Sequence, residues 1–427
     1  MEQSTSGQST SLNLVSDLNF TKEERQILRK LAGEVGKLAA MPINAEKRKL
    51  WTIHNDLEPV RPLVFCDPEN GWNEIITDEA LLCRNDLARL WEMTLRKEIF
   101  WSTQMRDDRV TEPFFNIPYS YTESDWGMHH VQIGGTDHGA YTWEPPLKDY
   151  ARDLPSLKFP EITVNYEMTE NVKHLAESIF GDLLKIRIKG TWWWTLGLTW
   201  SLINLRGLET YMLDFYMFPA ELHRFMEILR DGHIAKLDFL ETNHLLPDNT
   251  DMYVGSGGFG YTTQLPQKTF TGKTRLIDMW GFCESQETVG VDPELFAEFV
   301  LPYQMPILER FGLNCYGCCE GLDLRWDYIK NIPNLRRVSV SPWANEEKLA
   351  GQLGPNYIFS RKPNPAKLAL SEMDEDSVRK ELRKTLDIAT ANHCVIELIM
   401  KDNNTLGNNP RNVIDWCRIA REEIDKT

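Results

Sequence analysis

The first quarter of the chain carries apolar side chains at helical spacing. A representative set on one helix face is Leu87, Leu90, Trp91 and Leu95. This i, i+3, i+4, i+8 pattern predicts helices between residues 21 and about 104. Thr77, followed by two acidic residues, is a candidate helix start.

Two other segments lack such a pattern. Residues 1–20 are polar, and we predict a disordered tail there. Between about 106 and 160 the proline, glycine and aromatic content rises, which predicts long loops with short strands that cover a site. We therefore divide this part into a tail at 1–20 and an N-terminal helical cap and lid region at 21–160.

From residue 161 to the end, short apolar runs alternate with helical patterns. The runs lie at 162–166, 185–189, 251–254, 276–282, 313–318, 337–341, 356–360 and 394–400. Such alternation predicts a parallel sheet. Eight βα units that close on themselves form a (β/α)₈ TIM barrel, so we predict an α/β protein with this barrel at 161–427, a helical cap and a loop-rich insertion. A doubly wound sheet is the rival, but the glycine run at 255–260 does not open a helix, and we interpret it as a flexible loop.

Charge and composition limit the classes of partner. The 427 residues carry 47 basic and 63 acidic side chains, a formal charge of −16, which argues against general nucleic-acid binding. No apolar run is long enough to cross a bilayer, and the start does not resemble a signal peptide, so we expect a cytoplasmic protein without membrane contact. Three of the eight cysteines fall within five residues, which suggests a thiol cluster in a reducing compartment.

That thiol cluster lies at a predicted strand end, in the segment 314–321. If Tyr316 faces the barrel interior, strand alternation places Cys318 and Glu320 on the same side. A thiolate and a carboxylate there could bind zinc, which keeps three protein ligands in catalytic sites. The alternative is a set of small buried hydrophobic side chains beside a solvated acid.

Acidic and aromatic side chains accompany other predicted strand ends. Glu284 follows the strand that contains Phe282, and Asp402 follows the last strand. The carboxyl ends of barrel strands are where this fold places its catalytic groups. A surface carboxylate is the commoner role of any glutamate.

The second strand of the predicted barrel is followed by three consecutive tryptophans, Trp192, Trp193 and Trp194. Because side chains alternate along a strand, at least one of them should line a loop or cavity, which favours a flat or aromatic ligand. His129 lies in the lid region and could close over the mouth. Packing against the cap is the other interpretation of the tryptophans.

The segments 284–303 and 311–319 resemble the uroporphyrinogen decarboxylase superfamily. The helix that ends in Phe-Val-Leu-Pro-Tyr and the strand end Cys-Tyr-Gly-Cys-Cys are similar to its "Phe-Val-Pro-Tyr" helix and "His-x-Cys-Gly" strand end. The similarity runs from about residue 183 to the C-terminus. It implies a single (β/α)₈ barrel. The arginine-rich tetrapyrrole-binding segment of the decarboxylases is absent, which leaves the branch of corrinoid-dependent methyltransferases.

Zinc, a corrinoid and a partner protein follow from this resemblance as expectations. Some members hold zinc through the His-x-Cys pair and a later cysteine. Cys318 stands at the motif cysteine, Tyr316 replaces the histidine, and Asp402 stands where the later cysteine is expected. Glu284, Glu320 and Asp402 would replace the missing ligands.

Our hypothesis is a methyltransferase that takes a methyl group from a methoxylated aromatic donor and passes it to the Co(I) corrinoid of a partner protein. Zinc, with Glu284, Cys318 and Glu320 as ligands, would stabilise the departing oxygen, while Tyr316 donates a hydrogen bond to it. Glu284, Tyr316 and Asp402 are the predicted catalytic residues. Phe282, His129 and the three tryptophans are the predicted substrate-binding residues. A homodimer is compatible with this hypothesis.

Two rivals from other classes remain at this point. A metal-free decarboxylase would need cations around the mouth for substrate carboxylates. The cations near predicted strand ends are Lys189, Arg361, Lys362 and Lys401. A non-catalytic small-molecule binding protein would leave the acids at the strand ends without metal.

Overall fold

The computed structural model describes residues 17–129, 131–134 and 141–426. Two compact units make up this part of the chain. Unit 1 comprises residues 123–163 and 193–359. Unit 2 comprises residues up to 122, residues 164–192 and residues from 360 onward. The predicted tail at 1–20 lies mostly outside the described residues.

The main sheet has six strands in the order β1-β12-β11-β10-β9-β8. Their bounds are β1 Leu63–Cys66, β8 Trp280–Cys283, β9 Leu313–Tyr316, β10 Leu335–Val340, β11 Ile358–Arg361 and β12 Val395–Met400. The pairs β8–β9 and β9–β10 in unit 1 and β1–β12 in unit 2 are parallel. This confirms the α/β class. Among the described strands the pairing does not close into a ring of eight, so the closed barrel stays a prediction.

Three smaller sheets have two strands each. They are β2 Phe114–Ile117 with β7 Lys185–Ile188, β3 Tyr121–Glu123 with β6 Ile162–Val164, and β4 Val131–Gly134 with β5 Tyr141–Glu144. The predicted strand at 185–189 therefore exists as β7, and its partner is β2 in a parallel pair of unit 2.

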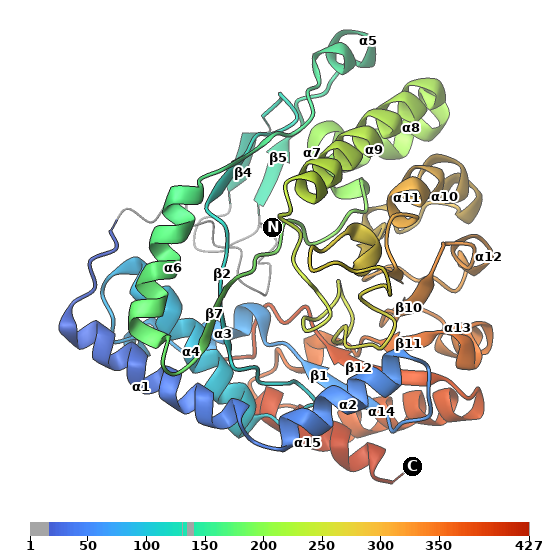
Figure 1. Ribbon diagram of the computed structural model, residues 1–427. Coiled ribbons are helices and arrows are strands. Elements are labelled where there is room, and N and C mark those ends of the chain that lie inside the picture. The colour runs from blue at the N-terminus through green and yellow to red at the C-terminus, as the bar shows by residue number, and fades with distance from the viewer. Residues whose placement is uncertain (1–16, 130, 135–140, 427) are drawn as a thin grey trace. The chain divides into compact units, whose positions relative to one another are not determined.

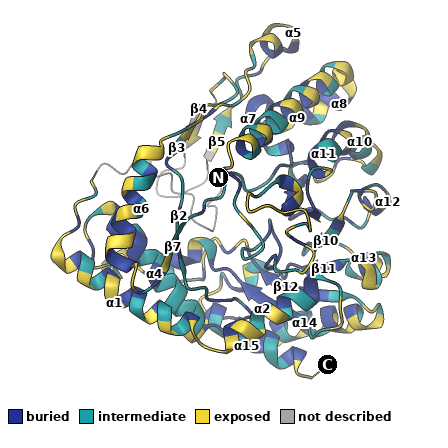
Figure 2. Ribbon diagram, in the orientation of Figure 1, coloured by how far each residue is buried: buried dark blue, intermediate teal, exposed yellow. Residues whose placement is uncertain are grey.

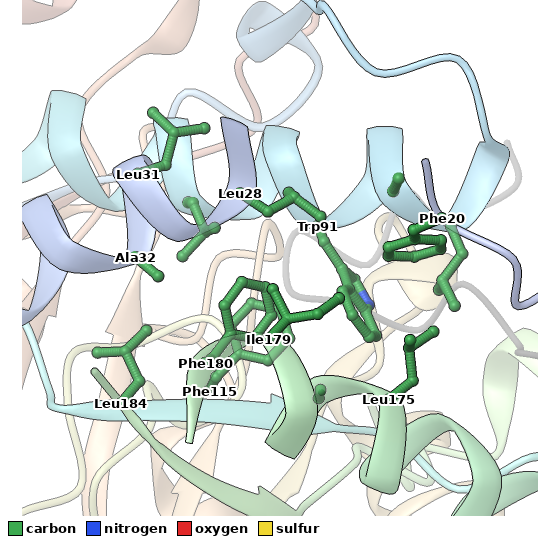
Figure 3. Close-up of a cluster of buried hydrophobic side chains, with 14 of the residues drawn as sticks. Phe20, Leu28, Leu31, Ala32, Trp91, Phe115, Leu175, Ile179, Phe180 and Leu184 are labelled. Carbon is green, nitrogen blue, oxygen red and sulfur yellow. The ribbon is translucent and has the colours of Figure 1, made fainter. Parts of the chain in front are cut away.

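Unit 2 is built on helices that pack around one apolar cluster. Its helices are α1 Lys22–Ala39, α2 Ile43–Asn55, α3 Trp72–Ile75, α4 Asp86–Gln104, α6 Tyr166–Phe180, α14 Glu375–Ala391 and α15 Arg411–Ile424. Trp91 of α4 meets Phe20, Phe115 and Phe180 at ring-centroid distances of 5.2–5.4 Å (Figure 3). Phe20, which falls within the predicted tail, is thus part of this core.

The helices of unit 1 range from single turns to α9, which has 24 residues. They are α5 Tyr150–Asp153, α7 Thr199–Arg206, α8 Leu208–Met217, α9 Pro219–Thr242, α10 Pro293–Phe299, α11 Leu301–Leu308, α12 Trp326–Ile329 and α13 Glu346–Leu353. They can be followed in Figure 1 from green to orange. The long helices carry a buried and an exposed side (Figure 2), as the helical periodicity predicts.

Three local expectations were wrong. Residues 63–66 form strand β1 inside the segment that we predicted to be helical, because this short run of leucine, valine, phenylalanine and cysteine favours a buried strand. Residues 251–254 do not form a strand. Only Tyr253 bridges to Phe259, because the glycine-rich turn between them folds the chain back on itself.

The third wrong expectation concerns a helix start. Thr77 precedes only a short 3-10 turn, Asp78–Ala80. Helix α4 begins after Asn85 instead, whose side chain accepts hydrogen bonds from the N–H groups of Leu87 and Ala88. No helix in the described ranges is both long and apolar enough to span a bilayer.

Candidate functional site

Strands β8 and β9 place their ends side by side in unit 1. The register pairs Cys283 with Tyr316, the last residues of the two strands. The chain segments that follow, starting at Glu284 and Gly317, therefore leave the sheet at the same edge. In open and closed parallel sheets this carboxyl edge is where sites are built.

Glu284 is a fully buried carboxyl group at this edge. Its Oε2 accepts a hydrogen bond of 2.9 Å from the Gln286 N–H. Its Oε1 has no hydrogen-bond partner among the described residues. Burial raises the pKa of Glu284 well above its usual value, and the nearby acids Glu287 and Glu320 raise it further. Its surroundings thus favour the neutral carboxylic acid, and one of its oxygens has no hydrogen-bond partner among the described residues.

The chain approaches Glu284 closely at Gly197. A Cβ atom on Gly197 would lie 2.3 Å from the Glu284 carbonyl oxygen and 2.9 Å from Oε1, so no other residue fits. The Gln304 side chain fixes this approach because its Nε2 donates to the carbonyl oxygens of Gly197 (2.7 Å) and Glu284 (2.9 Å). The loop before α7 is thereby pinned to the end of β8.

Tyr316 completes the same hydrogen-bond network. Its hydroxyl donates to Gln304 Oε1 at 2.7 Å and lies 3.3 Å from the Ser285 hydroxyl. Burial raises the pKa of Tyr316 well above its usual value, and the charge of Glu320 adds to this. The Tyr316 proton is therefore directed at Gln304 in this structure, and its predicted catalytic role stays a prediction.

Glu320 clamps the two strand ends together. Its Oε1 accepts from the Ser285 N–H and its Oε2 from the Cys318 N–H, both at 2.9 Å. The side chain is 1% exposed. Each carboxylate oxygen thus satisfies a buried backbone donor, one beyond β8 and one beyond β9.

Arg325 ties down the loop that follows Glu284. It donates to the Thr288 hydroxyl at 2.8 Å and to the Thr288 carbonyl at 2.6 Å, and its guanidinium lies over the Phe296 ring. Glu287 in this loop accepts from the Thr199 hydroxyl at 2.7 Å, and burial raises its pKa. This loop, next to the buried acid, is rigidly held.

Two adjacent thiols follow β9. The sulfur atoms of Cys318 and Cys319 lie 3.6 Å apart, with Cys318 buried and Cys319 partly buried. All eight cysteines lie in the described part of the chain and are free thiols. Glu284 and Glu320 do not form a metal-sized ligand group with these sulfurs among the described residues.

The three consecutive tryptophans pack against different aromatic partners. Trp194 meets the Phe282 ring edge-on at 5.4 Å, and Trp193 meets Phe311 at 6.3 Å, both in unit 1. Trp192 lies in unit 2, where it stacks against Tyr119 at 5.3 Å. Trp194 and Phe282 therefore form an aromatic pair, and Phe282 comes two residues before Glu284. Trp192 is buried in unit 2.

The remaining predicted residues, His129 and Asp402, each interact with an acidic side chain of their own unit. His129 is exposed in unit 1, where it pairs with Asp125. Asp402 follows β12 in unit 2, where its charge helps burial to raise the pKa of Glu69 to about 8. Their predicted roles in substrate binding and catalysis stay predictions.

Several residues of the site were not predicted from the sequence. Gln304, Arg325, Gly197 and Ser285 act through contacts between loops and a helix that are distant in the chain. Among these four residues, only Ser285 could have been identified from the sequence, because it directly follows the predicted site residue Glu284. Gln304 sits in an apolar helix, where its burial could be predicted but not its two carbonyl partners.

Comparison with known proteins finds similarity at the level of the fold. No family model matches the sequence, and no curated protein matches it. Among solved structures, a methyltransferase from Methanosarcina mazei is similar, with a TM-score of 0.50 and 11% sequence identity. The matched region covers 88% of this chain and 97% of that chain. At this identity the similarity shows a shared fold.

Proposed function

We propose that the chain is a methyltransferase that moves a methyl group from an O-methyl donor, a methoxylated aromatic compound, to the corrinoid of a partner protein. The fold shared with a methyltransferase supports the reaction class. The resemblance of the segments 284–303 and 311–319 to corrinoid-dependent methyltransferases supports the acceptor. The corrinoid supplies the nucleophile when it is bound.

The observation that carries the proposal is the buried acid at the end of β8. Cleavage of a methyl ether leaves a phenolate-type oxygen that needs a proton, because the free phenol has a pKa near about 10. Glu284 offers an oxygen without a hydrogen-bond partner among the described residues. In the proposed step the methyl–oxygen bond breaks, its electron pair stays on oxygen, the methyl group passes to the acceptor, and Glu284 gives its proton to that oxygen.

The other residues of the site position this acid. Gln304 and Gly197 fix the backbone at Glu284, and Glu320 joins the ends of β8 and β9. Trp194, which is partly exposed and packs against the buried Phe282 of β8, offers the aromatic ring that suits a planar donor.

The test mixes the purified chain with a reduced corrinoid protein and a panel of methoxylated aromatics. We expect loss of the Co(I) absorption together with release of the demethylated phenol. In a Glu284→Gln variant the rate should fall by roughly 10²–10⁴, the usual contribution of a positioned acid. The Glu298→Gln variant, which changes an exposed carboxylate of α10, is the matched control.

Three results would contradict the proposal. Full activity of Glu284→Gln would remove this residue from the reaction. Release of CO₂ from a carboxylated substrate without any methyl acceptor would indicate a decarboxylase. Ligand binding with no turnover under all of these conditions would indicate a binding protein.

A further inference from the structure

The adjacent thiols at the end of β9 have the spacing of two ligands on one metal ion. Cys318 Sγ and Cys319 Sγ lie 3.6 Å apart. Two sulfurs at about 2.3 Å from a tetrahedral zinc ion would be separated by roughly 3.8 Å. A disulfide would need about 2.05 Å. The pair therefore fits a shared soft ion better than a bond between the sulfurs.

The backbone that carries these thiols is fixed on every side within unit 1. The N–H of Gly317 donates to the Cys283 carbonyl at 2.9 Å. The hydroxyls of Ser256 and Ser339 donate to the carbonyls of Gly317 and Cys318, both at 2.7 Å. The Cys318 N–H donates to Glu320 at 2.9 Å. Four backbone groups of Gly317 and Cys318 are thus satisfied, so the backbone at the first thiol is held in place before any ion binds.

Gly317 makes this turn achievable. Its φ angle is +91°, and a Cβ atom there would lie 2.5 Å from the Leu322 side chain. Only glycine meets both conditions without strain. The chain can therefore turn sharply between Tyr316, the last residue of β9, and the first thiol.

The neighbouring side chains are committed to other partners. Both oxygens of Glu320 accept backbone hydrogen bonds, so binding an ion would compete with the clamp between β8 and β9. The Tyr316 hydroxyl donates to Gln304. Of the zinc ligands expected in unit 1, Cys318 stays a candidate because its sulfur lies 3.6 Å from that of Cys319, a second sulfur ligand that the resemblance does not imply.

We propose that Cys318 and Cys319 supply two of the ligands of a zinc ion, as a pair of thiolates from adjacent residues. This inference deepens the proposed function, since zinc at this strand end would act as a Lewis acid toward the departing oxygen while Glu284 supplies the proton. It differs from the expected set of Glu284, Cys318 and Glu320 by making Cys319 a ligand and Glu320 a positioning residue.

The test measures metal binding directly on the full chain. We expect about one zinc per chain and, after exchange for Co(II), sulfur-to-cobalt charge-transfer absorption. Zinc should protect two thiols from a thiol-modifying reagent, and a chelator should expose them. The variants Cys318→Ser and Cys319→Ser should each weaken zinc binding at least tenfold. Cys394→Ser, which changes a similarly exposed thiol in unit 2, should not.

The proposal is overturned if Cys319→Ser binds zinc as the unchanged chain does, or if the unchanged chain takes up no zinc and shows no Co(II)–sulfur absorption. The protection assay needs no substitution, so it remains decisive if Cys318→Ser fails to fold. Zinc bound by the two thiols without methyl transfer would leave this site standing and remove the proposed reaction. Methyl transfer by a chain that lacks zinc would support the proposed reaction and rule out the zinc site.

Discussion

Two buried glutamates at one strand edge have opposite environments. Glu320 satisfies two backbone N–H groups with its two oxygens, whereas Glu284 has one oxygen without a partner among the described residues. The hydrogen-bonding capacity of Glu320 is thus used by the backbone, while burial raises the pKa of Glu284 well above its usual value. Glu284, which has an oxygen without a partner among the described residues, is therefore suited to proton transfer. Glu320, whose two oxygens both accept hydrogen bonds, is suited to holding the two strand ends together.

The structural role of Glu320 predicts a stability effect. A Glu320→Gln change keeps the shape but turns one acceptor oxygen into an NH₂ group that faces a buried N–H. We expect a loss of about 1–3 kcal/mol in the free energy of unfolding, the cost of a buried unsatisfied donor. Thermal or urea unfolding of the variant measures this. The exposed Glu298→Gln variant is the control, and equal stability of both would show that the clamp contributes nothing.

At the scale of elements, the sequence predicts strongly periodic segments well. The strands β9, β10, β11 and β12 overlap the predicted runs, and the helices α8 and α9 lie between two of those runs, where helical patterns were predicted. Strand β1 was missed because four residues are too few to distinguish a strand from part of a helical pattern. The start of α4 was missed because both Thr77 and Asn85 can cap a helix, and only the structure shows that Asn85 does.

Glu24 links the starts of two helices and predicts a pH dependence. Its Oε2 accepts from the Thr21 N–H in the capping box of α1, and its Oε1 accepts from the N–H groups of Arg84 and Asn85 before α4. These hydrogen bonds outweigh burial and lower the pKa of Glu24 to about 2. The stabilisation is therefore complete above the unfolded pKa of about 4.5 and is lost as the pH falls toward 2.

The measurement is the free energy of unfolding of Glu24→Gln across this pH range. At pH 7 we expect the variant to be about 1–3 kcal/mol less stable than the unchanged chain. The difference should shrink steadily between pH 4.5 and 2, since protonation removes the same charge from the unchanged chain. Glu34→Gln, on the exposed side of α1, should show no such trend. A difference that stays constant down to pH 2 would contradict the role of the charge.

At the scale of the whole molecule, the sequence does not reveal how the two units share the chain. Unit 2 takes its residues from three separate segments, up to 122, 164–192 and from 360 onward. The spacing of apolar residues reports only local secondary structure. The predicted division into a cap at 21–160 and a barrel at 161–427 therefore rests on the order of these patterns along the chain. Long-range pairing of β1 with β12 has no local signal, because any parallel apolar strand could be the partner.

This pairing makes the C-terminal segment essential for unit 2. The parallel register joins Leu63 to Glu397 and Cys66 to Met400, and Figure 1 shows β1 in blue beside β12 in red. Helix α15 adds an ion pair of 2.8 Å from Arg421 to the buried Asp108. The segment after residue 393 also contains fully or almost fully buried apolar side chains, among them Leu398, Ile399, Met400, Val413, Trp416, Ile419 and Ala420.

A chain that ends at residue 393 should therefore lose the fold of unit 2. Burial of a large apolar side chain contributes about 1.5–3 kcal/mol. The loss of six of them is therefore comparable with the whole 5–15 kcal/mol that separates typical folded and unfolded states. We expect limited proteolysis followed by mass spectrometry to find rapid cleavage within residues 17–122. A chain that ends at Asp425 loses only the exposed Lys426 and the last residue, and it should resist cleavage like the full chain. Equal resistance of residues 17–122 in the shorter chain would show that unit 2 folds without β12 and α15.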